Sequence, residues 1–176
     1  VEVLDGRLAD EIPAFKAGNV LVTIRQIGCI AVVDLEAGKV VWAMDGHWRK
    51  PHQATVLDNG HIMIFDNMGN RGRSQVIEFD PVTMNAAWIY RGDEPDDFFS
   101  EQCGSNQRLP NGNTLISETD RGKAFEVTPD GEIVWKYINP AQTGEELEYI
   151  ASLFDVVRLP PGFAAGWARW PRGLRS

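Results

Sequence analysis

The residues of this chain best suited to chemistry are its histidines and the basic side chains beside one of them. His52 stands five residues before Leu57, at the start of an expected strand, and is preceded by Arg49 and Lys50. A neutral imidazole can act as a nucleophile or as a base near neutral pH. Arginine and lysine can hold the anionic oxygens of a group in transfer. We therefore predict His52 as a nucleophile with Arg49 and Lys50 as binding cations, the alternative being a histidine that caps the strand.

Other polar residues are weaker candidates. His47 lies in a connection and His61 follows a hairpin glycine, so both are expected at the surface. Gln107 and Arg108 lie on a later strand, close to its turn, and Arg121 lies in a loop. We predict these last three as substrate-binding residues, with structural or surface roles as the alternative.

The sequence predicts no metal site and no cofactor. Cys29 and Cys103 have no CxxC spacing, and His is too sparse for a zinc cluster. The simplest interpretation is one buried thiol in a strand and one thiol in a loop, and a disulfide between them stays open. The acidic run Asp93–Asp97 is expected to be a solvated loop, with calcium binding as the alternative.

Two sequence landmarks recur along the chain and indicate a structural repeat. Glycine turns that precede apolar strands are separated by 42, 52 and 50 residues, and a tryptophan late in each repeat recurs after 46 and 47 residues. Two independent landmarks with nearly the same period make a chance origin unlikely. The residues concerned are Gly18, Gly60, Gly112, Gly162, Trp42, Trp88 and Trp135.

Each repeat contains four strand-like runs rich in Val, Ile and aromatic residues and separated by turn residues. The Asn59-Gly60 pair predicts a type I′ hairpin turn, which needs a positive φ at both central residues. A weak helix is expected at residues 144–153. In the middle repeat the four runs are approximately Gln53–Leu57, His61–Phe65, Gln75–Phe79 and Ala86–Tyr90.

Four strands in each 40 to 50 residues are typical of β-propeller blades, so we predict an all-β fold with about three and a half four-stranded blades of a larger ring. A two-sheet sandwich would explain the strands but not the repeat. Since rings usually have about four to eight blades, the chain is interpreted as a fragment. The predicted blades span about residues 8–45, 50–92 and 103–139, with the start of another at 150–163, in a partial propeller of residues 1–165 followed by an unassigned tail at 166–176.

The composition of the chain limits the classes of partner that it is expected to bind. The formal charge of −8 argues against nucleic acid, which selects basic patches. No apolar run approaches the roughly 20 residues that a membrane helix needs. Unpaired blade faces would expose apolar surface, so we expect poor solubility or self-association, and a homo-oligomer stays open.

The run from Trp48 to Asn67 resembles the repeat of the arylsulfotransferase propellers, in which a histidine shortly before an L-x-N-G turn opens the innermost strand. The runs 107–116 and 131–137 are similar to the same family's blade, and the resemblance covers about residues 18–162. It implies a six-bladed propeller, exported to the periplasm, that moves a sulfuryl group from an aryl sulfate to a phenol through a histidine nucleophile. In the family, further His and Arg residues surround the central channel.

Within that resemblance, His52 is the histidine that matches. Alignment on the turn glycines makes Asp10 and Gly104 its counterparts in the neighbouring blades, so the chain departs from a family that draws histidines from several blades. Two other functions stay open. One is a non-catalytic propeller that binds a protein or a carbohydrate on one rim. The other is a quinone-dependent dehydrogenase-type propeller, which would need a stacking tryptophan and a calcium site.

Overall fold

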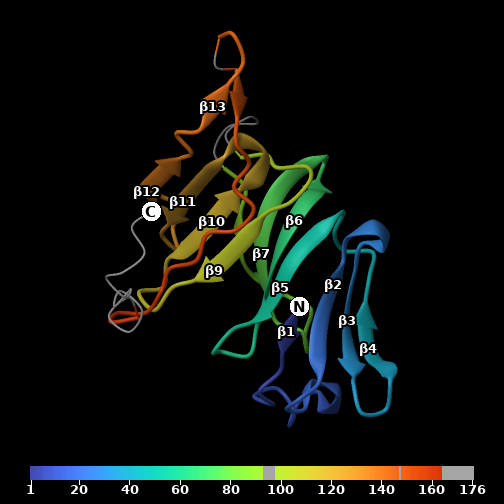
Figure 1. Cartoon of the computed structure of the whole chain (residues 1–176). Coiled ribbons are helices and arrows are strands. Elements are labelled where there is room, and N and C mark those ends of the chain that lie inside the picture. The colour runs from blue at the N-terminus through green and yellow to red at the C-terminus, as the bar shows by residue number, and fades with distance from the viewer. Residues whose placement is uncertain (93–97, 147, 164–176) are drawn as a thin grey trace, which may run out of the picture.

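The computed structural model describes residues 1–92, 98–146 and 148–163 (Figure 1). The acidic run at 93–97 and the whole of the tail predicted at 166–176 lie outside the described residues. Three four-stranded antiparallel sheets follow one another along the chain, and within each sheet the spatial order of the strands is their order in the sequence. The expectation of successive four-stranded blades is confirmed.

The strands and short helices have the following bounds. The first sheet contains β1 (Glu2–Val3), β2 (Val20–Ile24), β3 (Cys29–Asp34) and β4 (Lys39–Met44). The second contains β5 (Pro51–Val56), β6 (Ile62–Asn70), β7 (Arg73–Phe79) and β8 (Ala86–Tyr90). The third contains β9 (Ser105–Arg108), β10 (Thr114–Glu118), β11 (Lys123–Val127) and β12 (Ile133–Ile138). The 3₁₀-helical turns are η1 (Pro13–Phe15), η2 (Arg25–Ile27) and η3 (Thr119–Arg121), and a separate hairpin pairs β13 (Gln142–Thr143) with β14 (Tyr149–Ile150).

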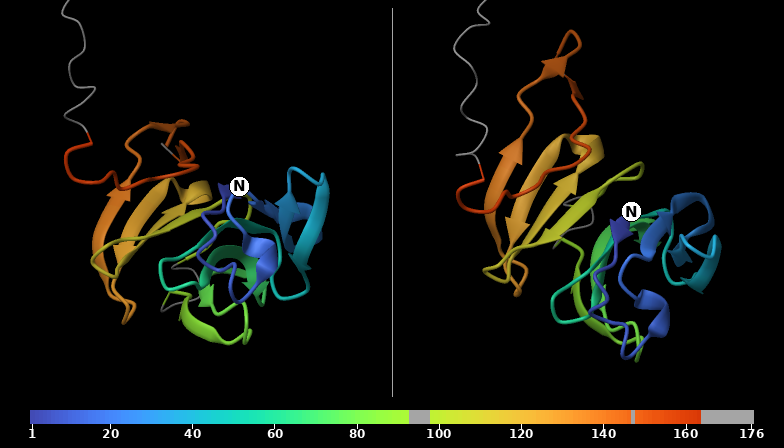
Figure 2. Two further views of the ribbon diagram at one scale, coloured as in Figure 1. Left: turned by 90° about the horizontal axis from the view of Figure 1, so that it is seen from below. Right: turned by 60° about the horizontal axis from the view of Figure 1, so that its bottom comes forward.

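The three sheets lie side by side as the radial blades of a partial β-propeller (Figures 1 and 2). Strand β5, at one edge of the second sheet, contacts both β2 of the first sheet and β9 of the third. The described residues include no helix that is long and apolar enough to cross a bilayer. Cys29 is buried, Cys103 is half-buried, and both are free thiols.

The apolar core lies in two layers, one between each pair of neighbouring sheets, and β6 contributes to both. Ile62 and Ile64 point into the layer shared with the first sheet, while Met63 and Phe65 point into the layer shared with the third. Side chains alternate between the two faces of a strand. Because both faces of β6 are covered here, residues 62–65 of the strand form a continuous apolar run rather than an alternating one.

The turns that mark the repeat differ from the expected geometry. Gly60 N–H donates to Leu57 O at 2.9 Å, and Leu57 N–H donates to His61 O at 2.8 Å. Gly60 has a φ of +82°, whereas Asn59 is not among the residues with positive φ. The loop is therefore a three-residue hairpin with glycine in the left-handed position, and the type I′ prediction is wrong. Asn59 instead donates its side-chain amide to Glu78 at 2.9 Å.

The helix expected at residues 144–153 is also wrong for the residues described there. Strands β13 and β14 pair in this segment, and Gly144 has a φ of +98°, which a right-handed helix does not permit. Ile150 packs over Gly122, where an added Cβ would lie 2.9 Å from Ile150 Cγ1. This contact with the third blade, together with strand pairing, outweighs the helical preference of the glutamates.

The innermost strand of the first blade lies upstream of the start expected at residue 8. Val3 of β1 pairs with Val20, as Val56 of β5 pairs with Ile62. A long connection containing η1 then joins β1 to β2, and Asp10 lies in that connection. Asp10 is therefore not the counterpart of His52.

Candidate functional site

His52 lies near the start of β5, opposite Phe65 of β6, and is half-buried. Its Nδ1 atom is 2.7 Å from Oδ1 of Asn67. The pairing of β5 with β6 shifts register between His52 and Thr55, and Gln53 there has a left-handed φ of +44°. This bulge sets the direction of His52 relative to the rest of the strand.

Asn67 determines which nitrogen of His52 carries the proton. The Asn67 side chain is fully buried, and its Nδ2 donates to the carbonyl oxygens of Ser100 at 2.7 Å and Cys103 at 2.8 Å. Because only the amide nitrogen can donate to these two carbonyls, Oδ1 must face the histidine as an acceptor. The neutral imidazole therefore carries its hydrogen on Nδ1 and keeps a lone pair on Nε2.

The support behind Asn67 comes from two strands and the segment that leads to β9. Ser74 Oγ donates to Asn67 O at 3.0 Å, and Ser100 N–H donates to Ser74 Oγ at 2.8 Å. Ser74 and Ser100 are both fully buried. The imidazole thus hydrogen-bonds to a group that is itself fixed from three sides, which limits the side chain's freedom.

The basic residues before His52 differ in their surroundings. Lys50 Nζ lies 2.6 Å from Glu101 Oε1, so its charge is paired. That hydrogen bond lowers the pKa of the Glu101 carboxyl. Arg49 is exposed, and its guanidinium has no partner among the described residues, while its backbone N–H donates to Asp66 at 2.9 Å. Arg49 therefore offers an uncommitted positive charge three residues from His52.

The three more distant candidates each have protein partners, and none contacts His52 in the described part of the chain. Gln107 binds the backbone of Arg158, accepting from its N–H at 2.8 Å and donating to its carbonyl at 3.3 Å. Arg108 Nη2 lies 2.5 Å from Glu78 Oε2. Arg121 lies 3.3 Å from the buried carboxylate of Glu118.

The remaining histidines lie elsewhere. His47 is exposed, with its ring centroid 5.9 Å from that of Trp48. His61 is only 28% exposed and binds Glu78 Oε1 through Nδ1 at 2.8 Å, so it does not simply face solvent as expected.

The register of the third blade gives His52 a different counterpart from the one that glycine alignment suggested. His52 pairs with Phe65, and the residue that pairs at the matching position of the third blade is Ser105, opposite Ser117. Gly104 lies one residue earlier, because β5 contains the bulge and β9 does not. Asn67, the partner that the sequence did not suggest, lies in β6, the second strand of the blade, and an amide placed there is the only signal that points to it.

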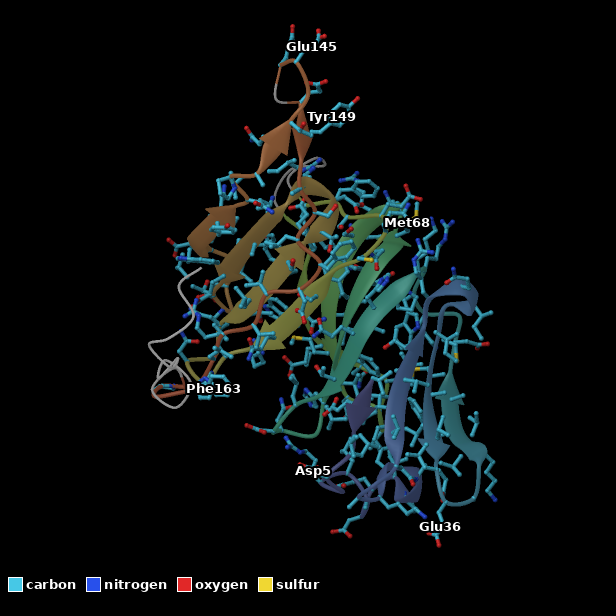
Figure 3. All side chains as sticks on the ribbon, in the orientation of Figure 1. Asp5, Glu36, Met68, Glu145, Tyr149 and Phe163 are labelled. Atoms are coloured by element: carbon cyan, nitrogen blue, oxygen red, sulfur yellow. The ribbon has the colours of Figure 1, made fainter. Side chains whose placement is uncertain are left out.

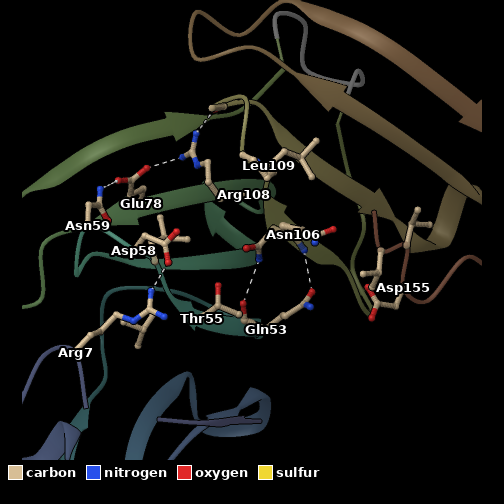
Figure 4. Close-up of a pocket in the computed structure, with 17 residues that line it drawn as sticks. Arg7, Gln53, Thr55, Asp58, Asn59, Glu78, Asn106, Arg108, Leu109 and Asp155 are labelled. Atoms are coloured by element: carbon tan, nitrogen blue, oxygen red, sulfur yellow. Dashed lines mark hydrogen bonds and ion pairs between the residues drawn. The ribbon is translucent and has the colours of Figure 1, made fainter. Parts of the chain in front are cut away.

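A cavity of about 700 Å³ extends along β5 from Gln53, the residue after His52, to the turn beyond Val56 (Figure 4). Met68 N–H donates to Arg49 O, which places the start of β5 at the Met68 end of the sheets, whereas Arg7, on the cavity wall, binds Asp5 at the other end (Figure 3). Gln107 and Arg108 line the cavity, but His52 does not. Within the described ranges, no three His, Cys, Asp or Glu side chains gather to hold a metal ion.

Comparison with solved structures places the chain among β-propellers. The WD40 propeller domain of Doa1 matches with a TM-score of 0.51 and 20% identity, over 70% of this chain and 37% of that one. Virginiamycin B lyase from Staphylococcus aureus matches with a TM-score of 0.48 and 20% identity, over 70% and 39%. BamB from Moraxella catarrhalis matches with a TM-score of 0.43 and 15% identity, over 72% and 34%. The chain thus spans less than half the length of each of these propellers.

No curated protein matches the sequence. The family model described as arylsulfotransferase (ASST), however, matches residues 8–140, which include His52, Asn67 and all of the second and third sheets. This match covers well over half of the chain, and the repeat and the blades agree with it. The chain therefore belongs to the arylsulfotransferase family.

Proposed function

We propose that this chain carries a sulfuryl-transfer site in which His52 is the nucleophile, an aryl sulfate is the donor and a phenol is the acceptor. The observation that supports this most directly is the 2.7 Å contact between His52 Nδ1 and Asn67 Oδ1. It holds the imidazole in the tautomer whose Nε2 can attack sulfur. The family membership supplies the substrate class.

The reaction has two displacements at sulfur. In the first, the Nε2 lone pair forms an N–S bond, the bond between sulfur and the aryl oxygen breaks, and the phenolate leaves with the bonding electrons and takes a proton from solvent. In the second, the acceptor phenol's oxygen attacks sulfur, the N–S bond breaks, and the phenol's proton passes to solvent. Sulfurylation makes the ring cationic, and the hydrogen bond from Nδ1–H to Asn67 stabilises that charge.

Arg49 is the candidate in this proposal for holding the sulfuryl oxygens. Its guanidinium has no partner in the described part of the chain, and a fork of N–H donors suits a tetrahedral oxyanion. Lys50 could contribute only by leaving Glu101. Gln107, Arg108 and Arg121 are weaker candidates, because their polar groups are engaged by protein partners.

Export to the periplasm is also part of the proposal, since the family resemblance implies it. Fractionation of the source cells, with antibody detection of the protein, tests this point. Recovery of the protein only with a cytoplasmic marker would contradict it.

The catalytic proposal is tested by release of 4-nitrophenol from 4-nitrophenyl sulfate in the presence of phenol. His52→Gln keeps a polar side chain of similar reach but removes the nucleophile, and we expect turnover to fall by roughly a thousandfold or more. His47→Gln is the matched control, because His47 is exposed and lies outside the site, and its turnover should equal that of the wild type. Unchanged turnover in His52→Gln would reject His52 as the nucleophile. Saturable binding of a macromolecule without any turnover would favour a non-catalytic propeller.

A further inference from the structure

The cavity along β5 has the size of a ligand site, and Gln53 lines it whereas the neighbouring His52 does not. Its volume of about 700 Å³ falls in the range of about 300 to 1,000 Å³ typical of small-molecule pockets. The inner strands β5 and β9 form its walls, and Asp155 to Val157 close another side. Figure 4 shows Gln53, Thr55 and Asn106 close together on this wall, with Arg7 and Asp155 on opposite sides of it.

The charged groups on the wall do not favour an anionic ligand. Arg7 is engaged by two carboxylates, Asp5 at 2.6 Å and Asp58 at 2.5 Å. Arg108 is engaged by Glu78 at 2.5 Å. Both lining arginines are therefore neutralised within the protein, and a sulfate or phosphate would find no uncommitted cation among the described lining residues.

The polar groups on the wall that have no described hydrogen-bond partner include both donors and acceptors. Asn106 is 3% exposed, and its buried Oδ1 accepts no hydrogen bond in the described structure. Asp155 has no partner among the described residues and adds a second free acceptor. The Thr55 hydroxyl, which can donate or accept, and the Gln53 amide nitrogen, which can only donate, are also without described partners.

Gln53 is held in an unfavourable backbone conformation. Its φ of +44° is unusual for a residue other than glycine. Its Oε1 accepts from Asn106 N–H at 2.9 Å, and its carbonyl accepts from Asn106 Nδ2 at 3.2 Å. These bonds fix both residues on the wall, and they leave Asn106 Oδ1 and Gln53 Nε2 without a hydrogen-bond partner among the described residues. Backbone strain of this kind concentrates at ligand sites.

From this wall we infer that the cavity binds an uncharged, polyhydroxylated ligand of the size of a disaccharide. A hydroxyl group both donates and accepts, so it can satisfy neighbouring donors and acceptors together. An anion would leave the Asn106 and Asp155 acceptors unpaired, and a cation would leave the Gln53 donor unpaired. Aliphatic residues such as Leu109 and Val156 give the C–H face of a sugar ring an apolar surface. This inference does not depend on sulfuryl transfer at His52.

The probes that test it are maltose and cellobiose, added to the full chain and followed by saturation-transfer NMR and then by titration calorimetry. At least one of the two sugars should bind saturably. Thr55→Val preserves the shape of the side chain and removes one hydroxyl, so binding should weaken about threefold to tenfold. Thr143→Val is the matched control, because Thr143 is exposed on β13, outside the cavity, and its affinity should equal that of the wild type.

Charge is tested at Asp155. Asp155→Asn keeps an acceptor and should change sugar affinity by less than about twofold, whereas Asp155→Ala should weaken it about as much as Thr55→Val does. Spermidine and 4-nitrophenyl sulfate serve as cationic and anionic probes. Failure of both sugars to bind would overturn the inference. So would sugar binding that Thr55→Val leaves intact, or Thr55-dependent binding of either charged probe that is tighter than that of the sugars.

Discussion

Arg108 and Arg158 occupy equivalent positions in successive repeats and make the same pair of contacts. Arg108 binds Glu78 of the preceding blade and lies over the Trp88 ring at 5.0 Å. Arg158 binds Glu126 at 3.0 Å and lies over Trp135 at 5.8 Å. Each arginine therefore reaches back to the blade before it and covers the recurring tryptophan. The contacts between successive blades therefore repeat along the chain, as the blades themselves do.

The interface between the first two blades replaces this ion pair with apolar residues. By strand register, Val56 occupies the position equivalent to that of Arg108 and Arg158. Val32 occupies the position equivalent to that of Glu78 and Glu126. Val32 is fully buried, and Val56 and Trp42 pack against the same core. The charged and the apolar versions are thus alternatives for one structural position.

Breaking the ion pair on one side should destabilise the protein more than replacing both partners. Arg108→Val leaves the nearly buried Glu78 without its arginine, and we expect the free energy of unfolding to fall by about 1–3 kcal/mol. The double variant Glu78→Val with Arg108→Val recreates the pair Val32 and Val56 and should lose less than that single variant. Urea unfolding of both variants measures the difference.

The control for this comparison is Arg73→Val, since Arg73 is exposed on β7 and should change stability by no more than about 0.5 kcal/mol. A double variant that loses at least as much unfolding free energy as Arg108→Val alone would show that the two positions do not act as one interchangeable pair.

Acid should weaken the blade interfaces through the same glutamates. Burial raises the pKa of Glu78, but hydrogen bonds from Asn59 and His61 and the charge of Arg108 outweigh burial and hold the pKa below its usual 4.5. The hydrogen bond from Asn113 is the main cause that lowers the pKa of Glu126. The folded state therefore binds fewer protons than the unfolded chain as pH falls below 4.5. The contribution is complete above that pH and is lost as pH falls through the folded pKa.

Glu78→Gln should flatten this acid dependence. We expect a smaller fall in the unfolding free energy between pH 5 and pH 3 in the variant than in the wild type, measured by urea unfolding at each pH. Burial raises the pKa of Asp66, which acts in the opposite direction, but it contributes equally to both proteins and cancels. Parallel curves for the two proteins would contradict the assignment to Glu78.

Gly104 is required by the packing of Phe65. A Cβ added at Gly104 would lie 2.4 Å from Phe65 Cζ, and Phe65 is fully buried between the second and third blades. Gly104→Ala should therefore cost about 1–3 kcal/mol of unfolding free energy through overpacking. Adding Phe65→Leu, which shortens the opposing side chain, should make the glycine substitution less costly than it is in the wild-type background. Thermal denaturation of the wild type, the two single variants and the double variant measures these losses. If Gly104→Ala cost the same stability in the wild-type and the Phe65→Leu backgrounds, the cause would not be steric.

The tautomer of His52 can be measured directly. With Asn67 Oδ1 accepting from Nδ1, long-range ¹H–¹⁵N NMR of the neutral ring should show the hydrogen on Nδ1 and a bare Nε2. Exposed His47, which has no described hydrogen-bond partner, provides an internal comparison without a fixed tautomer. A His52 ring protonated on Nε2 would remove the basis for nucleophilic attack from that nitrogen.

The sequence by itself determined the strands, their grouping and the family. Turn residues and β-propensity act over a few neighbours, so β8 has the predicted bounds Ala86–Tyr90 and the glycines at 60 and 112 mark hairpins in the structure. A period repeated several times then predicts that equivalent units pack side by side, because each must bury the same faces.

Tertiary structure decided register and side-chain partners. Counting from the turn glycines made Asp10 and Gly104 the counterparts of His52, but a bulge and a long β1–β2 connection change the register without changing the glycine pattern. In the same way, Asn67 near His52 and Glu78 beside Arg108 come together only when blades and strands pack. Such contacts join residues 15 and 30 positions apart, where local sequence preferences no longer act.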